Sequence, residues 1–168
     1  MVEPSSRKLA IDWLKNKLIN RKNGLVFDDI DSSSFDIIQS FLEANDHPLK
    51  TPAIYYRAFP GESTATFLSI LSEELTAKLG NLEFKSSRSL SEIIDAAGLK
   101  LIIIDQSYLH PLNTLDELLR QFADCHVGLI LVGTYSQMKI AKIISHPTVS
   151  QWSRLAINCQ CESLAKIC

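Results

Sequence analysis

Small residues and hydroxyl groups follow an apolar run in the segment AIYYRAFPGESTATFLSIL, residues 53–71. The run predicts a strand, Pro60 and Gly61 predict a tight turn, and the pattern that follows predicts a helix. Backbone N–H groups at such a helix start can bind phosphate, and a hydroxyl group such as that of Ser63 or Thr64 can bind Mg²⁺. The segment is therefore a candidate phosphate-binding loop.

This candidate loop departs from a working phosphate-binding loop at two positions. In the pattern G-x-x-x-x-G-K-[ST], Tyr56 stands at the first glycine and Glu62 stands at the lysine. A carboxylate at the lysine position would repel the β- and γ-phosphates by on the order of several kcal/mol. We therefore expect a vestigial nucleotide site; the alternative is an ordinary turn that caps the following helix.

Further candidate residues stand at the ends of other apolar runs. Asp105 ends LKLIIID and could hold Mg²⁺ together with Ser63, and Gln106 follows at the position where a glutamate would activate water. An amide can orient a water molecule but cannot take its proton. Thr134, after VGLILVG, is placed to sense a γ-phosphate, and Arg154 is placed to reach the phosphate of a neighbouring subunit.

The elements that would position these residues alternate between strands and helices. Strands are expected at AIYYRAF, NLEFKSS, LKLIIID, HVGLILVGT and SRLAINC, and GLVFDD is either a short strand or a turn. Such alternation predicts a three-layer α/β fold with a parallel sheet and ligands at the carboxyl ends of its strands. We expect residues 1–50 to form a helical N-terminal segment packed on an α/β core of residues 51–168.

The segments LKLIIIDQSYLHPLNTLDELLRQF, VGLILVGTYSQMKIAKI and QWSRLAI resemble the core of AAA+ ATPases, in particular bacterial transposition proteins of the TniB/TnsC type. The resemblance covers about two-thirds of the chain. It implies a P-loop NTPase-like (RecA/AAA+-like) sheet, with ATP and Mg²⁺ as cofactors. It also implies that the Walker B strand lies beside the sensor strand and that the phosphate-loop strand lies inside the sheet.

The departures at Tyr56, Glu62 and Gln106 affect the parts that bind or hydrolyse ATP, and few residues follow the last strand to form a helical lid. We therefore expect a degenerate, non-hydrolysing protein that regulates or scaffolds an ATPase or a DNA-associated complex. Its partner would be an active AAA+ ATPase or a second copy of the chain. Arg154 would then complete the site of that neighbour.

Two alternatives remain open. In the first, the protein is an active ATPase in which Ser63 and Asp105 hold Mg²⁺, Arg57 replaces the lysine and Gln106 positions water. In the second, it is an interaction module unrelated to nucleotides, since fold alone does not fix function.

Composition excludes several classes of protein. The chain has 168 residues, of which 46% are hydrophobic and 21% charged, and this favours a globular domain over a disordered one. The net charge of −2 argues against general DNA binding, and no secretory or membrane-length apolar segment is present, so we expect a soluble cytoplasmic protein. A set of basic residues could contact DNA phosphates but is interpreted as solvated surface. Four come from one side of the first helix and two from a later helix: Arg7, Lys8, Lys15, Lys22, Lys139 and Lys142.

Three other groups of residues are interpreted as structural. Asp28, Asp29 and Asp31 match no calcium loop and suit helix capping. A nucleophilic pair of Ser107 and His110 lacks any supporting motif. The cysteines match no zinc pattern and are expected to be reduced thiols; they are Cys125, Cys159, Cys161 and Cys168.

Overall fold

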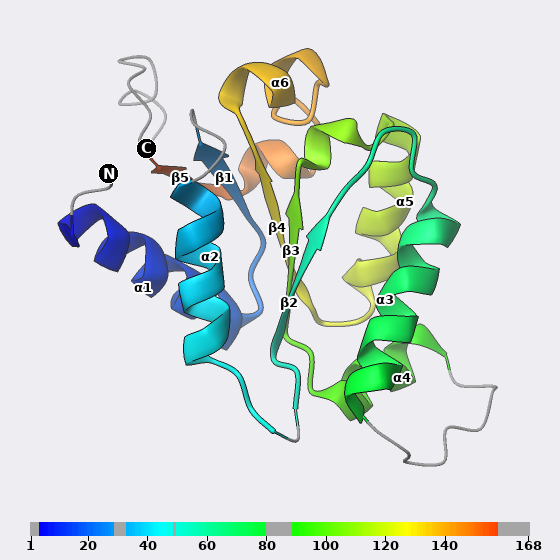
Figure 1. Ribbon diagram of the computed structural model, residues 1–168. Helices are drawn as coiled ribbons and strands as arrows, with labels where there is room; N and C mark the ends of the chain where they lie inside the picture. Colours follow the sequence, from blue (N-terminus) through cyan, green and yellow to red (C-terminus); the bar gives the residue numbers. More distant parts are fainter. Residues whose placement is uncertain (1–3, 29–32, 49, 80–88, 158–168) are drawn as a thin grey trace.

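The computed structural model describes residues 4–28, 33–48, 50–79 and 89–157. In this part of the chain a 5-stranded parallel sheet lies between two layers of helices, with the strand order β2-β3-β4-β1-β5 (Figure 1). The strands are β1 (Gly24–Asp28), β2 (Ala53–Arg57), β3 (Leu101–Asp105), β4 (Gly128–Gly133) and β5 (Ser153–Ile157). The helices are α1 (Pro4–Asn20), α2 (Ser33–Ala44), α3 (Thr64–Leu79), α4 (Leu90–Ala97), α5 (Leu112–Ala123) and α6 (Tyr135–Ile140). The predicted parallel α/β architecture is confirmed.

The middle strands are buried on both faces. Residues 101–104 of β3 are 0% exposed, and every residue of β4 is buried. A continuous apolar run is typical of a parallel strand that is covered by helices on both sides. The strands expected at AIYYRAF, LKLIIID, HVGLILVGT and SRLAINC are therefore confirmed, whereas NLEFKSS lies outside the described residues.

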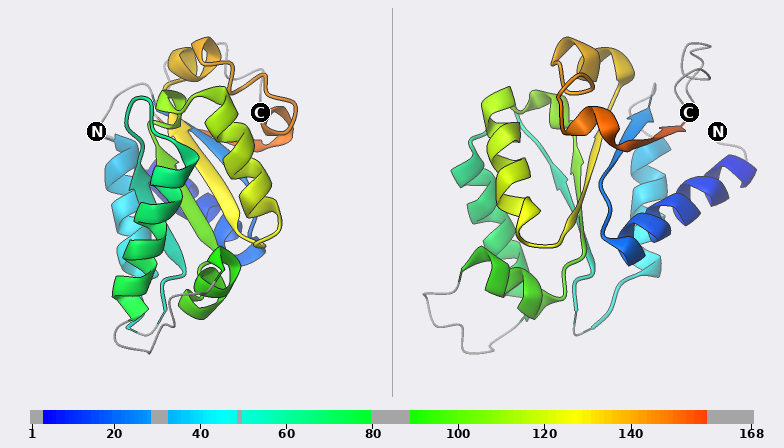
Figure 2. Two further views of the ribbon diagram at one scale, coloured as in Figure 1. Left: turned by 90° about the vertical axis from the view of Figure 1, so that its right-hand side faces the viewer. Right: turned by 180° about the vertical axis from the view of Figure 1, so that it is seen from behind.

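The two layers of helices enclose two separate hydrophobic cores. Helices α1 and α2 cover one face of the sheet, and α3, α4 and α5 cover the other (Figures 1 and 2). Successive side chains of β3 alternate between these cores, with Ile103 facing the first group of helices and Ile102 and Ile104 facing the second. This packing fixes the strand ends, where the candidate residues lie.

Strand β1 is an inner strand that pairs with β4 on one side and β5 on the other. Trp13 of α1 packs against Gly24 at its start, where a larger residue would collide with the indole ring. Residues 1–50 therefore contribute a strand to the sheet, and the expected division at residue 50 does not separate a helical segment from the core. GLVFDD, predicted as a strand or a turn, is a strand.

The strand order corrects one expectation and supports another. The strand that ends at Asp105 lies beside the strand that precedes Thr134, as the resemblance implied. The strand that precedes Pro60, however, is β2, and β2 is at the edge of the sheet rather than inside it. The candidate phosphate-binding loop is therefore attached to the wrong strand for that role. In the described ranges no helix is long and apolar enough to cross a membrane.

Candidate functional site

A cavity of about 220 Å³ opens at the carboxyl ends of β1, β2, β3 and β4. Arg57, Asp105, Gln106 and Thr134, all singled out from the sequence, line this cavity. The carboxyl ends of parallel strands are where ligands bind in open α/β sheets. Of the three strand ends expected to form one pocket, those at Asp105 and at Thr134 line this cavity, whereas residues 59–61 do not.

Asp105 is held in place by its neighbours on β2 and β3. The Tyr55 hydroxyl group donates a hydrogen bond to Oδ2 of Asp105 at 2.6 Å, and the backbone N–H of Gln106 donates to Oδ1 at 2.8 Å. Burial raises the pKa of Tyr55, and the hydrogen bond to Asp105 raises it further. Arg57 stands opposite Asp105 in the β2–β3 register, so that a cation and an anion flank the cavity on adjacent strands.

Gln106 and Thr134 each lie in a turn after a strand, and the turn determines the backbone conformation of the first and the hydrogen bonds of the second. The backbone of Gln106 is left-handed, with φ 52°, a conformation that costs a residue other than glycine about 1 kcal/mol. Thr134 is the N-cap of α6: its hydroxyl oxygen accepts from the N–H of Gln137 at 3.3 Å, and its O–H donates to the side-chain oxygen of Gln137 at 2.7 Å. The predicted role of Thr134 as a sensor of phosphate is not tested by this geometry, which assigns it a helix-capping role.

The end of β1 supplies cavity residues that the sequence interpretation did not place there. Asp28 is 4% exposed, and its Oδ2 accepts a hydrogen bond of 2.7 Å from the backbone N–H of Ser34 at the start of α2. Phe35 and Asp36 of α2 also line the cavity. The sequence signal was present, because GLVFD is an apolar run followed by a helix, but its shortness left it ambiguous with a turn. The helix-capping function expected for Asp28, Asp29 and Asp31 is confirmed for Asp28.

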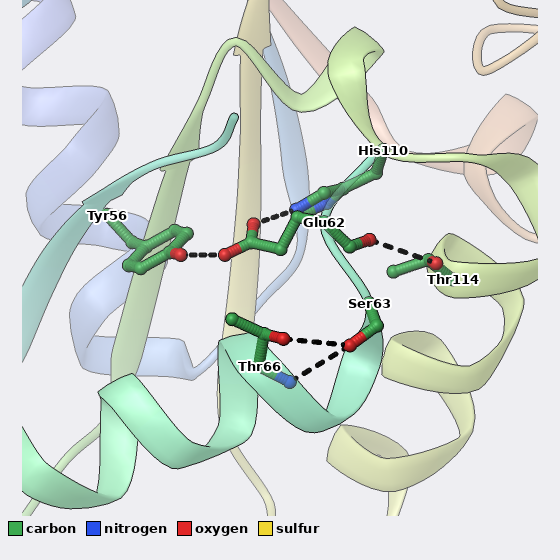
Figure 3. Close-up of polar contacts among 6 residues, drawn as sticks. All are labelled: Tyr56, Glu62, Ser63, Thr66, His110 and Thr114. Atoms are coloured by element: carbon green, nitrogen blue, oxygen red, sulfur yellow. Dashed lines mark hydrogen bonds and ion pairs between the residues drawn. The ribbon is translucent and has the colours of Figure 1, made fainter. Parts of the chain in front are cut away.

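Pro60, Gly61, Glu62, Ser63 and Thr64 do not line the cavity. Gly61 adopts φ +73°, and this turn directs Glu62 into the protein, where it is 1% exposed. Figure 3 shows the Glu62 carboxylate between Tyr56 and His110, while its backbone oxygen accepts from the hydroxyl of Thr114 at 3.3 Å. The expectation that Glu62 faces a phosphate is wrong, because its carboxylate is hydrogen-bonded inside the protein.

The rest of this turn caps a helix. Oγ of Ser63 accepts from the N–H of Thr66 at 3.2 Å, which satisfies one of the free N–H groups in the first turn of α3 (Figure 3). Ser63 does not share the cavity of Asp105, so the structure does not bring together the pair that was expected to hold Mg²⁺. The ordinary alternative, a strand-to-helix turn, describes residues 60–64 correctly.

The remaining candidate residues are dispersed. Arg154 lies on edge strand β5 opposite Leu25, near the amino end of the sheet and away from Asp105. Ser107 donates to the carbonyl of Val132 at 3.2 Å whereas His110 contacts Glu62, so these two form no nucleophilic pair. Helices α1 and α6 lie at separate places on the molecule, so Lys139 of α6 does not extend the basic side of α1 (Figures 1 and 2).

Comparison with known proteins adds no assignment: no family model matches the chain, and no curated protein matches it.

Within the described ranges, no group of three or more side chains of the metal-binding types converges on one point. Asp29 and Asp31, and three of the four cysteines, lie outside those ranges. Cys125 is a free, buried thiol.

Proposed function

We propose that this protein has an AAA+-like sheet with a degenerate nucleotide site, and that it acts by binding a protein partner rather than by hydrolysing ATP. The observation that carries the proposal is the hydrogen bond from the N–H of Ser34 to the carboxylate of Asp28. It lies at the junction of an inner strand and the helix that follows it, and that junction is where phosphate-binding loops hold their ligand.

In this proposal, β1 takes the role of the phosphate-loop strand that the sequence interpretation gave to β2. The order β2-β3-β4-β1-β5 then has the Walker-B-like strand beside the sensor-like strand and the phosphate-loop strand inside the sheet. The sequence from Asp28 to Asp36 is DDIDSSSFD, which contains no glycine and no lysine. The degenerate phosphate loop is thus the one after β1 rather than the one after β2, and the loop after β1 departs further from the phosphate-loop pattern.

Charge at this junction opposes a polyphosphate. Two like charges about 4 Å apart repel by about 4 kcal/mol at an effective dielectric constant of about 20. The N-terminus of a helix stabilises an anion by about 0.3–1 kcal/mol, and the carboxylate of Asp28 already uses that position. The repulsion therefore exceeds the attraction, and ATP binding is disfavoured.

The size of the cavity also disfavours ATP binding. Its volume of about 220 Å³ is below the range of about 300–1,000 Å³ that is typical of small-molecule sites. A nucleoside triphosphate is a large ligand by that standard. The active-ATPase alternative retains one supporting observation, since Arg57 and Asp105 line the same cavity.

Two measurements test the proposal. Titration calorimetry with ATP and Mg²⁺ is expected to show no saturable binding at millimolar nucleotide, with phosphate release at the buffer rate, for the native chain and for Asp105→Ala alike. Micromolar binding that is lost in Asp105→Ala would establish the ATPase alternative instead. A pull-down from native lysate then separates the regulatory role from a module unrelated to nucleotides: the former requires recovery of an ATPase with intact motifs, weakened by Arg154→Ala.

A further inference from the structure

The cavity at the carboxyl ends of β1–β4 is acidic. Asp28, Asp36 and Asp105 contribute carboxylates, and Arg57 is the one cation among the described residues that line it. Asp36 is exposed, and its carboxylate forms no hydrogen bond or ion pair with any described residue. The cavity therefore has the opposite charge from a phosphate site and would attract a cation.

Its walls combine this charge with aromatic rings. Phe35 is 43% exposed at the opening, and its ring meets that of Tyr55 edge to face, with the centroids 5.6 Å apart. Tyr108 and the amides of Gln106 and Gln137 complete the lining on the side of β3 and β4. Aromatic faces attract organic cations, and amide oxygens accept hydrogen bonds from their N–H groups.

A bare metal ion suits this lining poorly. Divalent ions need several oxygen ligands close to one point, whereas no cluster of three metal-ligating side chains is formed by the described residues. Both oxygens of Asp105 also already accept a hydrogen bond. Each retains a further lone pair, which can accept from a planar donor that approaches from the cavity.

We propose that this cavity binds the guanidinium group of an arginine side chain presented by a protein partner. The inference rests on the proposed function, of which it names the recognition chemistry. Guanidinium is planar, donates paired hydrogen bonds to a carboxylate and stacks on aromatic rings, and so matches Asp105, Phe35 and Tyr55. The volume of about 220 Å³ accommodates a side chain, and the exposed ring of Phe35 offers apolar contact to the surface that carries it.

The test uses N-acetyl-arginine amide as the probe and N-acetyl-citrulline amide as a control of the same shape without charge. We expect saturable amide chemical-shift changes at residues of the cavity with the arginine compound only. Asp105→Asn is expected to weaken binding about tenfold, because charge-assisted hydrogen bonds to the guanidinium group become neutral ones. Asp36→Asn is expected to weaken it a few-fold, and Asp12→Asn, an equal change of charge on the distant helix α1, to leave it unchanged.

Arg57→Gln supplies the sharpest readout, because removing the resident cation should strengthen arginine binding a few-fold while weakening any binding of ATP. Circular dichroism verifies that each variant is folded; if Asp105→Asn is not, the exposed positions Asp36 and Arg57 carry the test. Equal binding of the two amides, no saturable binding of either, or binding of spermidine in place of the arginine compound would overturn the inference. None of these results would restore ATP binding, so the proposed function is judged separately by calorimetry with ATP.

Discussion

The imidazole of His110 lies 2.6 Å from the carboxylate of Glu62, and both side chains are 0% exposed. Tyr56 donates its hydroxyl group to the other carboxylate oxygen, while Nδ1 of His110 has no partner among the described residues. This cluster joins the turn after β2 to the segment that precedes α5. Glu62, which stands at the lysine position of the phosphate-loop pattern, is therefore part of the protein interior.

Replacement of Glu62 by lysine tests that conclusion directly. Glu62→Lys restores the residue of the phosphate-loop pattern, yet we expect no gain of ATP binding, because the side chain points away from the cavity. Instead, a buried cation beside His110 should lower the free energy of unfolding by about 3–5 kcal/mol. Urea unfolding measures this loss, with Glu73→Lys on the exposed side of α3 as the control. A stable Glu62→Lys protein that binds ATP would contradict the assignment.

Removal of the whole cluster should cost less than removal of one member. His110→Leu removes one of the two side-chain partners of the buried Glu62 carboxylate and is expected to destabilise the protein by about 3–5 kcal/mol. The triple variant with Tyr56→Phe and Glu62→Leu leaves no buried charge, so it should recover much of that loss. Urea unfolding of the single, double and triple variants measures the coupling free energies between these side chains. Additive losses of stability would show that the side chains are independent.

The contact between Asp28 and α2 should be visible in both stability and exchange. Asp28→Ala removes the acceptor for the N–H of Ser34 and is expected to cost about 0.5–2 kcal/mol. Asp28→Asn retains an acceptor oxygen and should cost less. Hydrogen exchange of the Ser34 amide measures the local effect, with Asp36→Asn as a nearby control that is expected to change stability by under about 0.5 kcal/mol. Unchanged protection of the Ser34 amide in Asp28→Ala would show that this hydrogen bond does not stabilise the start of α2.

Stability should fall at alkaline pH because two tyrosines resist ionisation. Burial raises the pKa of Tyr55 and Tyr56 above the ordinary value of 10.0, and hydrogen bonds to Asp105 and Glu62 add to the shift. The unfolded chain then loses these protons at lower pH than the folded chain. This contribution is therefore complete below about pH 10, declines above it, and is lost as pH rises through the raised pKa of the folded state. Urea unfolding across this range, compared with Tyr55→Phe, should show a shallower decline in the variant.

Cys125 should react slowly with alkylating agents. Burial raises the pKa of its thiol, and the side chain is 8% exposed, so both the thiolate fraction and its access are reduced. Peptide mapping after treatment with iodoacetamide at mildly alkaline pH is expected to show protection of Cys125 that is lost in urea. Equal labelling in the native and unfolded proteins would contradict the buried placement.

The sequence by itself determined the architecture, because its signals are local. Runs such as LIIID and GLILVG are too apolar to be exposed, and their alternation with helices leaves parallel pairing as the available arrangement. Local chemistry also determined the helix ends: Ser89 and Glu92 form the capping box of α4, and Gly98 ends it with φ 68°.

Only the tertiary structure decided which strand carries the candidate site. The pairing of β1 with β4 and β5 joins segments that are far apart in the chain, and no local pattern in GLVFD distinguishes an inner strand from a turn. The orientation of the Glu62 side chain could not be predicted from the sequence either. It depends on the left-handed backbone of Gly61 and on His110, nearly fifty residues later. Charge and spacing predicted that Glu62 would face a ligand at the strand ends; long-range packing instead buries Glu62 and brings Asp28 to the cavity.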